Sequence, residues 1–326
     1  MLFSDRLVQE DRFHIEYYSP KKQAEWDAFC ENSNQQSFLF KRDFMEYHAD
    51  RFTDASVMIY AKGKLVGLLL ANSREDAIHS HQGLSYGGFI VKPIIKTLDM
   101  LAMVNATLKF YAERGKRQLQ IKTLPSIYRS KPTEAEALAL AMLKGTITRT
   151  DSYYIIDLAE GYQPNRNRKR ALKKAEASGL KLVSGCFEPF WNKVLIPNLT
   201  ERFGVKPVHS LAEIELLAKR FPKQIHCYGA FLNDEIKAGV VIFETKHVAH
   251  FQYSSGTDSR NEDGALDVLF DAIIKKYLRK KYISFGSSSE GNGTILNEGL
   301  VYWKESFGAV PLTQHFYSIL LSNLSS

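Results

Sequence analysis

The sequence predicts an α/β protein with mixed sheets, formed by tandem duplication of one domain. Two β-hairpins of matching pattern are each followed, in the same order, by a strand, an amphipathic helix and a further strand. The chain has 326 residues, which suits about two domains, and its 44% hydrophobic and 24% charged residues are typical of a globular protein. We therefore expect one domain over residues 1–150 and a second over residues 151–326.

The two hairpins are the clearest part of this repeat. Residues 58–71 read MIYAKGKLVGLLLA, and residues 228–244 read YGAFLNDEIKAGVVIFE. Each segment has an apolar strand, a polar two-residue turn and a second apolar strand, and the turns are Lys62–Gly63 and Asn233–Asp234. Short polar turns rich in Gly, Asn or Asp between apolar runs are typical of β-hairpins.

The remaining elements of each half follow in the same order. A third strand comes first, then a helix with apolar residues at i, i+3, i+4 and i+7, then a strand. Glu262 or Asp263 is expected to cap the start of the second helix. The expected segments are residues 80–91, 98–111 and 117–124 in the first half, and 247–256, 266–278 and 281–287 in the second.

A short basic segment opens the second half. Residues 166–176 read RNRKRALKKAE, with six basic residues and one acid, and Gly179 stands where a helix would end. On a helix, five of the basic residues share one face, which suits a nucleic acid, a nucleotide diphosphate or an anionic membrane surface. The alternative is a solvated basic helix without a partner. The five residues are Arg166, Lys169, Arg170, Lys173 and Lys174.

Several classes of protein are disfavoured by composition. Cys30, Cys186 and Cys227 are scattered and odd in number, which fits neither a disulfide framework nor zinc spacing, and the histidines form no metal motif. No apolar run approaches the roughly 18 residues of a membrane span, and the charged N-terminus does not resemble a secretory signal. We expect a cytoplasmic protein with no bound metal and no tightly bound cofactor.

Three segments carry a resemblance to a known family. Residues 167–182 read NRKRALKKAEASGLKL, residues 251–273 read FQYSSGTDSRNEDGALDVLFDAI, and residues 281–309 read KYISFGSSSEGNGTILNEGLVYWKESFGA. Together with the duplicated order of elements, they resemble the FemABX-like group of double-GNAT acyltransferases. The resemblance implies two GNAT-like domains, with the donor site in the second.

The activity that this resemblance implies is the transfer of an acyl or aminoacyl group from an activated ester or thioester to an amine. The donor would be an aminoacyl-tRNA or an acyl-CoA, used as a co-substrate. The acceptor would be a small-molecule or nucleotide-linked amine, such as a cell-envelope or sugar-nucleotide precursor.

The catalytic candidates lie near the end of the chain. In the family pattern the lysine that matches Lys304 positions the acyl ester and its developing charge, and Trp303 and Phe307 would hold Lys304 between them. Glu290 or Glu298 could take a proton from the attacking ammonium group, and Tyr253 could supply a hydroxyl to the leaving group. The alternative is that Lys304 is a surface residue without a catalytic role and that its aromatic neighbours belong to the core.

The binding candidates surround that group. On the donor side, RNEDGA departs from the usual coenzyme A motif, because Gly264 follows Arg260 by four residues and two acids intervene. The first half has no glycine at the matching place, so only the second half is expected to bind a donor. The donor candidates are Ser254, Ser255, Arg260 and Gly264; the substrate candidates are Arg166, Lys169, Arg170, Lys173, Tyr86, Gly291, Gly293 and Trp303.

Two other functions fit the same residues. One is an acetyl-CoA-dependent small-molecule N-acetyltransferase, which would bind coenzyme A tightly and need no basic helix. The other is a non-catalytic RNA-binding relative, whose affinity would fall steeply with salt.

Overall fold

The structure is a computed structural model that describes residues 12–257 and 264–322. The chain divides into two compact units, Met1–Asp151 with Thr313–Ser326 and Ser152–Leu312, which are called unit 1 and unit 2 below. The sequence-based division at residue 150 did not place the last strand in the first unit. That strand belongs there because its residues Phe316–Leu320 pair antiparallel with Gln118–Lys122.

Unit 1 contains two groups of strands with helices packed on them. One group is ordered β1-β3-β4-β7, and the other contains β17, β8, β6, β5 and β2. The elements are β1 (Phe13–Tyr17), α2 (Gln23–Glu31), α3 (Arg42–Met45), β2 (Thr53–Asp54), β3 (Val57–Ala61), β4 (Lys64–Leu69), β5 (Asn72–Arg74), β6 (Ala77–His79), β7 (Phe89–Val91), α4 (Thr97–Ala112), β8 (Gln118–Lys122), α5 (Ala135–Met142), the first part of β9 (Thr146–Asp157) and most of β17 (Val310–Leu320).

The third strand of the first half is shorter than predicted. Only Phe89–Val91 of the expected segment 80–91 is a strand, because the backbone leaves the extended region at His81 (φ +53°) and Gly88 (φ +92°). A small hairpin, β5–β6, precedes this loop, and β6 pairs in parallel with β8. The pattern of apolar residues alone could not distinguish this inserted hairpin and loop from one continuous strand.

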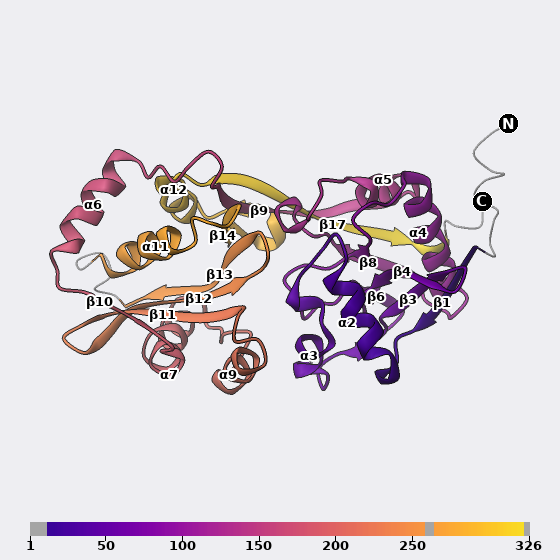
Figure 1. Cartoon of the computed structure of the whole chain (residues 1–326), viewed down its shortest axis with the longest axis horizontal. Coiled ribbons are helices and arrows are strands. Elements are labelled where there is room, and N and C mark those ends of the chain that lie inside the picture. Colours follow the sequence, from indigo (N-terminus) through magenta and orange to yellow (C-terminus); the bar gives the residue numbers. More distant parts are fainter. Residues whose placement is uncertain (1–11, 258–263, 323–326) are drawn as a thin grey trace. The chain divides into compact units, whose positions relative to one another are not determined.

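Unit 2 is a mixed sheet covered by helices on both faces. Its strand order is β10-β11-β12-β13-β14-β9, in which β13 and β14 are parallel. Figure 1 shows α11 and α12 on one side of the strands and α7 and α9 on the other. The elements are α6 (Arg166–Glu176), β10 (Lys181–Ser184), α7 (Phe187–Phe190), a π-helical turn (Trp191–Leu195), α8 (Ile196–Phe203), α9 (Leu211–Arg220), β11 (Ile225–Leu232), β12 (Glu235–Glu244), β13 (Val248–Gly256), α11 (Ala265–Lys276), β14 (Tyr282–Ser287), β15 (Ser289–Glu290), β16 (Ile295–Leu296) and α12 (Glu298–Ser306).

Local sequence explains most of these elements. Both predicted hairpins form, and all four turn residues have positive φ: Lys62 and Gly63 at 51° and 71°, Asn233 and Asp234 at 51° and 61°. This geometry is that of type I′ turns, which match the twist of the flanking strands. The predicted strand 247–256 and both amphipathic helices also form. Glu262 and Asp263, the expected caps of α11, lie outside the described residues.

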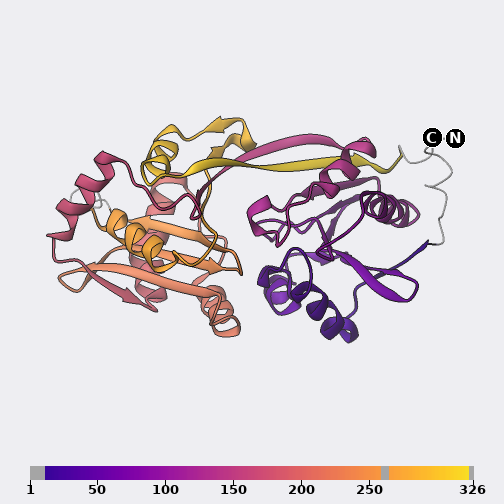
Figure 2. The same ribbon diagram turned by 45° about the horizontal axis from the view of Figure 1, so that its top comes forward.

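The basic segment forms the predicted helix, α6. Asn165 caps its start by accepting a hydrogen bond from the backbone N–H of Arg168 at 2.8 Å. The helix ends at Glu176, and Gly179 takes a positive φ of 78° after the C-cap Ala177. Figure 2 shows α6 at the margin of unit 2 with α11 beside it.

Candidate active site

The parallel strands β13 and β14 pair over only a short length. Their pairs are Val248 with Tyr282, Ala249 with Ile283, and His250 with Ser284, whereas β13 continues to Gly256 and β14 to Ser287. The pairing of β12 with β13 also shifts register at this point, so Gln252 is an extra residue in β13. The strands therefore diverge toward their carboxyl ends, the edge at which α/β sheets bind ligands.

Lys304 reaches the end of β14 from α12. Its side chain is buried, and Nζ donates hydrogen bonds to the carbonyl oxygens of Gly286 at 3.0 Å and Ser287 at 2.8 Å. The ammonium nitrogen also lies 5.7 Å from the centre of the Tyr154 ring. Burial lowers the pKa of Lys304 to about 7, because removing an ammonium group from water disfavours its charged form.

The Lys304 ammonium has capacity for another partner. An ammonium group has three N–H bonds, and within residues 12–257 and 264–322 its hydrogen bonds are those to the two carbonyls. The third N–H therefore has no hydrogen-bond partner in those ranges.

His250 belongs to the short parallel pairing of β13 with β14 and lies close to Lys304 of α12. Its ring is buried, and Nδ1 lies 3.0 Å from the Ser284 hydroxyl. Burial, and then the charge of Lys304, lower the pKa of His250 to about 4, so the ring is neutral at neutral pH. Sequence analysis missed His250, because a histidine in an apolar strand gives no signal of its neighbours in other elements.

Trp303 and Phe307 do not hold Lys304 between them as predicted. Both rings pack against Phe270 of α11, with centroid distances of 4.6 and 5.9 Å, and against each other at 5.1 Å. Trp303 Nε1 also donates a hydrogen bond to Asp267 at 2.9 Å. Since residues four apart share one face of a helix, this pair fixes α12 on α11 and belongs to the core.

Tyr253 lies on the opposite face of β13 from the ring of Phe251. Phe251 stacks on Phe270 at 4.2 Å, whereas Tyr253 packs edge-on against Trp191 at 5.1 Å. Residues two apart normally point the same way in a strand, and the extra residue Gln252 reverses this. The Tyr253 hydroxyl lies 2.6 Å from Nδ1 of His209 and accepts a hydrogen bond from the His209 backbone N–H at 3.2 Å.

The two predicted carboxylates lie on the surface beyond β14. The segment after Ser287 forms a small hairpin, β15–β16, and the glycines at its turn have positive φ, 55° at Gly291 and 87° at Gly293. Glu290 is exposed and accepts a hydrogen bond from Asn297 Nδ2 at 2.7 Å, and Glu298 is exposed in the first turn of α12. No contact of either carboxylate with Lys304 is seen in the described residues.

The predicted donor residues that the structure describes have different surroundings. Ser254 is exposed, and Ser255 is buried with its hydroxyl accepting a hydrogen bond from Asn198 Nδ2 at 2.5 Å. Gly264 precedes α11 with φ of 64°, and a Cβ there would lie 2.6 Å from Cβ of Ala175 in α6. Gly264 thus allows α6 to approach closely. Arg260 lies outside the described residues.

One basic residue of α6 is buried. Arg168 forms an ion pair with Asp267, donates to the Ser306 hydroxyl at 3.0 Å, and lies 4.4 Å from the centre of the Phe307 ring. Sequence analysis missed this role. The signal was present, because Arg168 shares the helix face of the buried Leu172 and Ala175 at i, i+4 and i+7.

The basic face of α6 is exposed, as the sequence predicts. Its residues have no ion pair with any acid in the part of the chain that the structure describes, and Arg170 donates a hydrogen bond to its neighbour Asn167 at 2.8 Å. The exposed residues of this face are Arg166, Lys169, Arg170, Lys173 and Lys174.

Tyr86 belongs to the interior of unit 1. Its ring is buried against Phe40 and Tyr128, and its hydroxyl lies 3.2 Å from that of Ser37. Tyr86, predicted as a substrate-binding residue, therefore lies in a buried aromatic cluster. Sequence alone could not show it, because a tyrosine beside two glycines suits either setting.

The described residues offer neither a cluster of metal ligands nor a membrane-spanning helix. Residues 12–257 and 264–322 contain no group of three or more His, Cys, Asp or Glu side chains that could hold a metal ion. In the same ranges, no helix combines the length and apolar character that crossing a membrane requires.

Comparisons with known proteins agree on the fold. The sequence matches no protein-family model and no curated protein. The structure is similar to that of FemX, with a TM-score of 0.67 at 10% identity over 94% of this chain and 97% of that one. It is also similar to L-PGS from Bacillus licheniformis (TM-score 0.60, 12% identity, 93% of each chain).

A third similar structure is a tandem GNAT protein from the clavulanic acid biosynthesis pathway (TM-score 0.52, 10% identity, 95% of this chain and 98% of that one). The duplicated order of elements and the diverging strands of unit 2 agree with these likenesses, which extend over nearly the whole chain. The protein therefore has the double-GNAT acyltransferase fold of FemX-like proteins.

Proposed function

We propose that the protein is an N-acyltransferase whose reaction takes place where β13 and β14 diverge in unit 2. The observation that carries the proposal is the buried Lys304 ammonium, which is fixed by two carbonyl groups and keeps one N–H for a ligand. A fixed donor in a buried site stabilises a developing oxyanion much more than a donor in water does.

The reaction would proceed by addition and elimination. The lone pair of a neutral amine attacks the acyl carbonyl carbon, a C–N bond forms, and the carbonyl π electrons move to oxygen. The free N–H of Lys304 would stabilise that oxyanion. When the intermediate collapses, the bond from carbon to the ester oxygen or thioester sulfur breaks. The leaving group then gains a proton, and the new amide nitrogen loses one.

The hydroxyl of Tyr253, on the other face of β13, would transfer the protons that the leaving group gains and the amide nitrogen loses. It is hydrogen bonded to Nδ1 of His209, which can accept or return a proton without a change of position. This assigns oxyanion stabilisation to Lys304 and proton transfer to Tyr253 with His209.

Two observations support an aminoacyl-tRNA donor over an acyl-CoA donor. The start of α11, where a GNAT protein would bind the pyrophosphate of coenzyme A, is closely approached by Ala175 of α6, and Asp267 in its first turn is paired with Arg168. The exposed basic face of α6 lies on the helix that covers this end, and it suits an extended polyanion. We propose a small-molecule or nucleotide-linked amine as the acceptor.

Unit 1 differs from unit 2 in the strand pairing at the place that corresponds to the proposed donor site. In unit 2 the third strand of the hairpin group pairs with the next strand, whereas in unit 1 β7 pairs with β4, and β8 pairs with β6 of the inserted hairpin. The inserted hairpin occupies the edge of β8 that a donor site would need. This supports a single donor site in each chain, in unit 2.

The test is a transfer assay with the full chain. It supplies labelled aminoacyl-tRNA or labelled acetyl-CoA with a panel of amines, and compares the protein with Lys304→Met and with Glu305→Gln, a change at the adjacent exposed residue of α12. Removal of an oxyanion donor should lower kcat by about 100-fold or more. Glu305→Gln should retain activity. Full activity of Lys304→Met would contradict the assignment.

The basic face of α6 also favours a second candidate, a non-catalytic RNA-binding protein. In that case tRNA should bind with strong salt dependence and no acyl group should move from any donor. Transfer from acetyl-CoA, with no effect of the α6 charges, would instead support the small-molecule N-acetyltransferase.

A further inference from the structure

A cavity in unit 2 lies at the other end of β14 from Lys304. It has a volume of about 500 Å³. Its residues Tyr277 and Lys280 precede the start of β14, whereas Lys304 contacts the carbonyls at the end of that strand. The cavity is therefore separate from the proposed acyl-transfer site. Its lining residues are Ser184, His226, Tyr228, Glu244, Lys276, Tyr277, Arg279 and Lys280.

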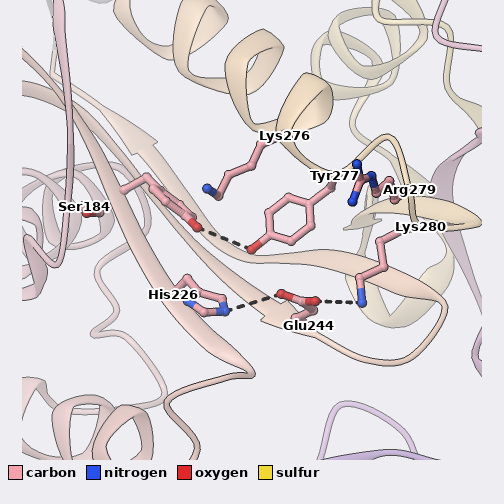
Figure 3. Close-up of a pocket in the computed structure, with 8 residues that line it drawn as sticks. Ser184, His226, Glu244, Lys276, Tyr277, Arg279 and Lys280 are labelled. Atoms are coloured by element: carbon pink, nitrogen blue, oxygen red, sulfur yellow. Dashed lines mark hydrogen bonds and ion pairs between the residues drawn. The ribbon is translucent and has the colours of Figure 1, made fainter.

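The charges around this cavity are unbalanced. Glu244 is its single carboxylate, and it already accepts from Lys280 at 2.7 Å and contacts His226 at 3.4 Å. Lys276 and Arg279 are exposed and have no ion pair with any acid in the described ranges. Figure 3 shows Lys276 and Tyr277 at the end of α11 and Lys280 beyond it reaching toward the strands, with Arg279 to the side of Tyr277. Two positive charges are thus left for a ligand.

Two tyrosine hydroxyls lie among these cations. The hydroxyls of Tyr228 and Tyr277 are 3.4 Å apart, and Lys276 Nζ lies 5.7 Å from the centre of the Tyr228 ring. Tyr277 is buried, and burial, followed by its interactions with Tyr228 and Glu244, raises its pKa, so its hydroxyl keeps its proton at neutral pH. The site therefore offers hydroxyl donors together with ammonium and guanidinium groups, a combination that suits phosphate oxygens.

We propose that this cavity binds a phosphate monoester that carries a sugar or nucleoside. A phosphate monoester has a charge of about −2 at neutral pH, which matches the two unpaired cations. The volume is in the range of ordinary small-molecule sites and exceeds what a bare phosphate fills. The exposed part of the Tyr228 ring offers an apolar surface for the rest of the ligand.

The test is isothermal titration calorimetry of the full chain at low salt with adenosine 5′-monophosphate, adenosine and inorganic phosphate. We expect one nucleotide per chain, with adenosine and inorganic phosphate each binding at least tenfold more weakly. Equal affinity for adenosine would overturn the phosphate assignment, and equal affinity for inorganic phosphate would overturn the monoester assignment. The absence of saturable binding would overturn the site.

Variants of the residues that line the cavity test whether the nucleotide binds there. Lys276→Gln with Arg279→Gln should weaken nucleotide binding at least tenfold, and both residues are exposed, so the fold should persist. Glu244→Gln removes the only carboxylate and should tighten binding several-fold. The matched control, Lys206→Gln with Lys219→Gln, removes the same charge from exposed residues of unit 2 that do not line the cavity, and should change affinity less than twofold. Equal weakening by the control would overturn the site. None of these results depends on the proposed transferase activity.

Discussion

At the scale of single residues, the pKa values of two buried groups predict how stability depends on pH. The pKa of Lys304 is about 7 in the folded chain, below its ordinary value of 10.5. Between these values the unfolded chain binds more protons, so the folded state gains stability as pH rises from about 7 toward 10.5. The cost of burying the ammonium is complete below about pH 7.

The change Lys304→Met should therefore stabilise the fold, and more so in acid. Since each pKa unit corresponds to about 1.4 kcal/mol, we expect the gain in unfolding free energy to be about 2 kcal/mol larger at pH 6 than at pH 9. Denaturant unfolding at the two pH values measures this difference. An equal effect at both would mean that the lysine is not desolvated in the folded protein.

His250 predicts a change in a lower pH range. Its pKa is about 4 in the folded chain and 6.5 ordinarily, so the unfolded chain again binds more protons between these values. Its contribution to stability is present above about pH 6.5 and is lost as pH falls toward 4. His250→Asn should flatten this part of the stability curve, measured by thermal unfolding from pH 7 to pH 4.

Tyr253 provides a residue-scale test of proton transfer. Tyr253→Phe removes the hydroxyl beside His209 and leaves the ring that packs on Trp191. If the hydroxyl acts in general acid–base catalysis, kcat should fall by about 100-fold, with KM little changed. The pH dependence of kcat should also lose one limb. A normal kcat and an unchanged pH profile for this variant would show that Tyr253 contributes to packing and not to proton transfer.

At the scale of elements, α6 has two faces with different roles. Arg168 is buried and pairs with Asp267, whereas Lys169 is exposed and has no ion pair in the described part of the chain. Loss of one partner of a buried pair leaves an uncompensated charge. Arg168→Met should therefore lower the free energy of unfolding by about 3 kcal/mol, while Lys169→Met should change it by less than about 0.5 kcal/mol. Chemical denaturation of both variants tests this contrast.

Changes on the exposed face of α6 should affect tRNA binding and leave the stability of the fold unchanged. Reversal of Lys169, Arg170 and Lys173 to Glu should preserve the fold and abolish binding of tRNA, because these side chains face solvent. Partial neutralisation to Gln should reduce the slope of log K against log salt by about 2 to 3. Filter binding over a range of salt concentrations measures the slope. An unchanged slope would show that this face does not contact the polyanion.

At the scale of the whole molecule, the duplication does not duplicate the site. In unit 2 a buried lysine donates to the end of the second strand of the short parallel pair β13–β14, whereas in unit 1 the short parallel pair joins the inserted hairpin to β8. We expect one donor molecule per chain. Native mass spectrometry with tRNA and, separately, with coenzyme A should show a 1:1 complex with one of them, and two equivalents of either would contradict this view of unit 1.

The sequence determined the elements common to the two halves and their order. Polar two-residue turns predicted both hairpins, helical spacing predicted α4, α6 and α11, and the repetition of this order predicted the double-GNAT fold. These signals are local, because turn chemistry and side-chain periodicity act over a few residues. The exception was the segment 80–91, where positive φ at His81 and Gly88 interrupts a pattern that looked continuous.

Only the tertiary structure determined the candidate site. The carbonyls that hold Lys304 come from residues 17 and 18 positions earlier, and His209 meets Tyr253 across 44 positions. The extra residue in β13 decides which face Tyr253 takes. Such contacts depend on strand register and on the packing of helices against the sheet. A pattern of residue types along the chain cannot specify them.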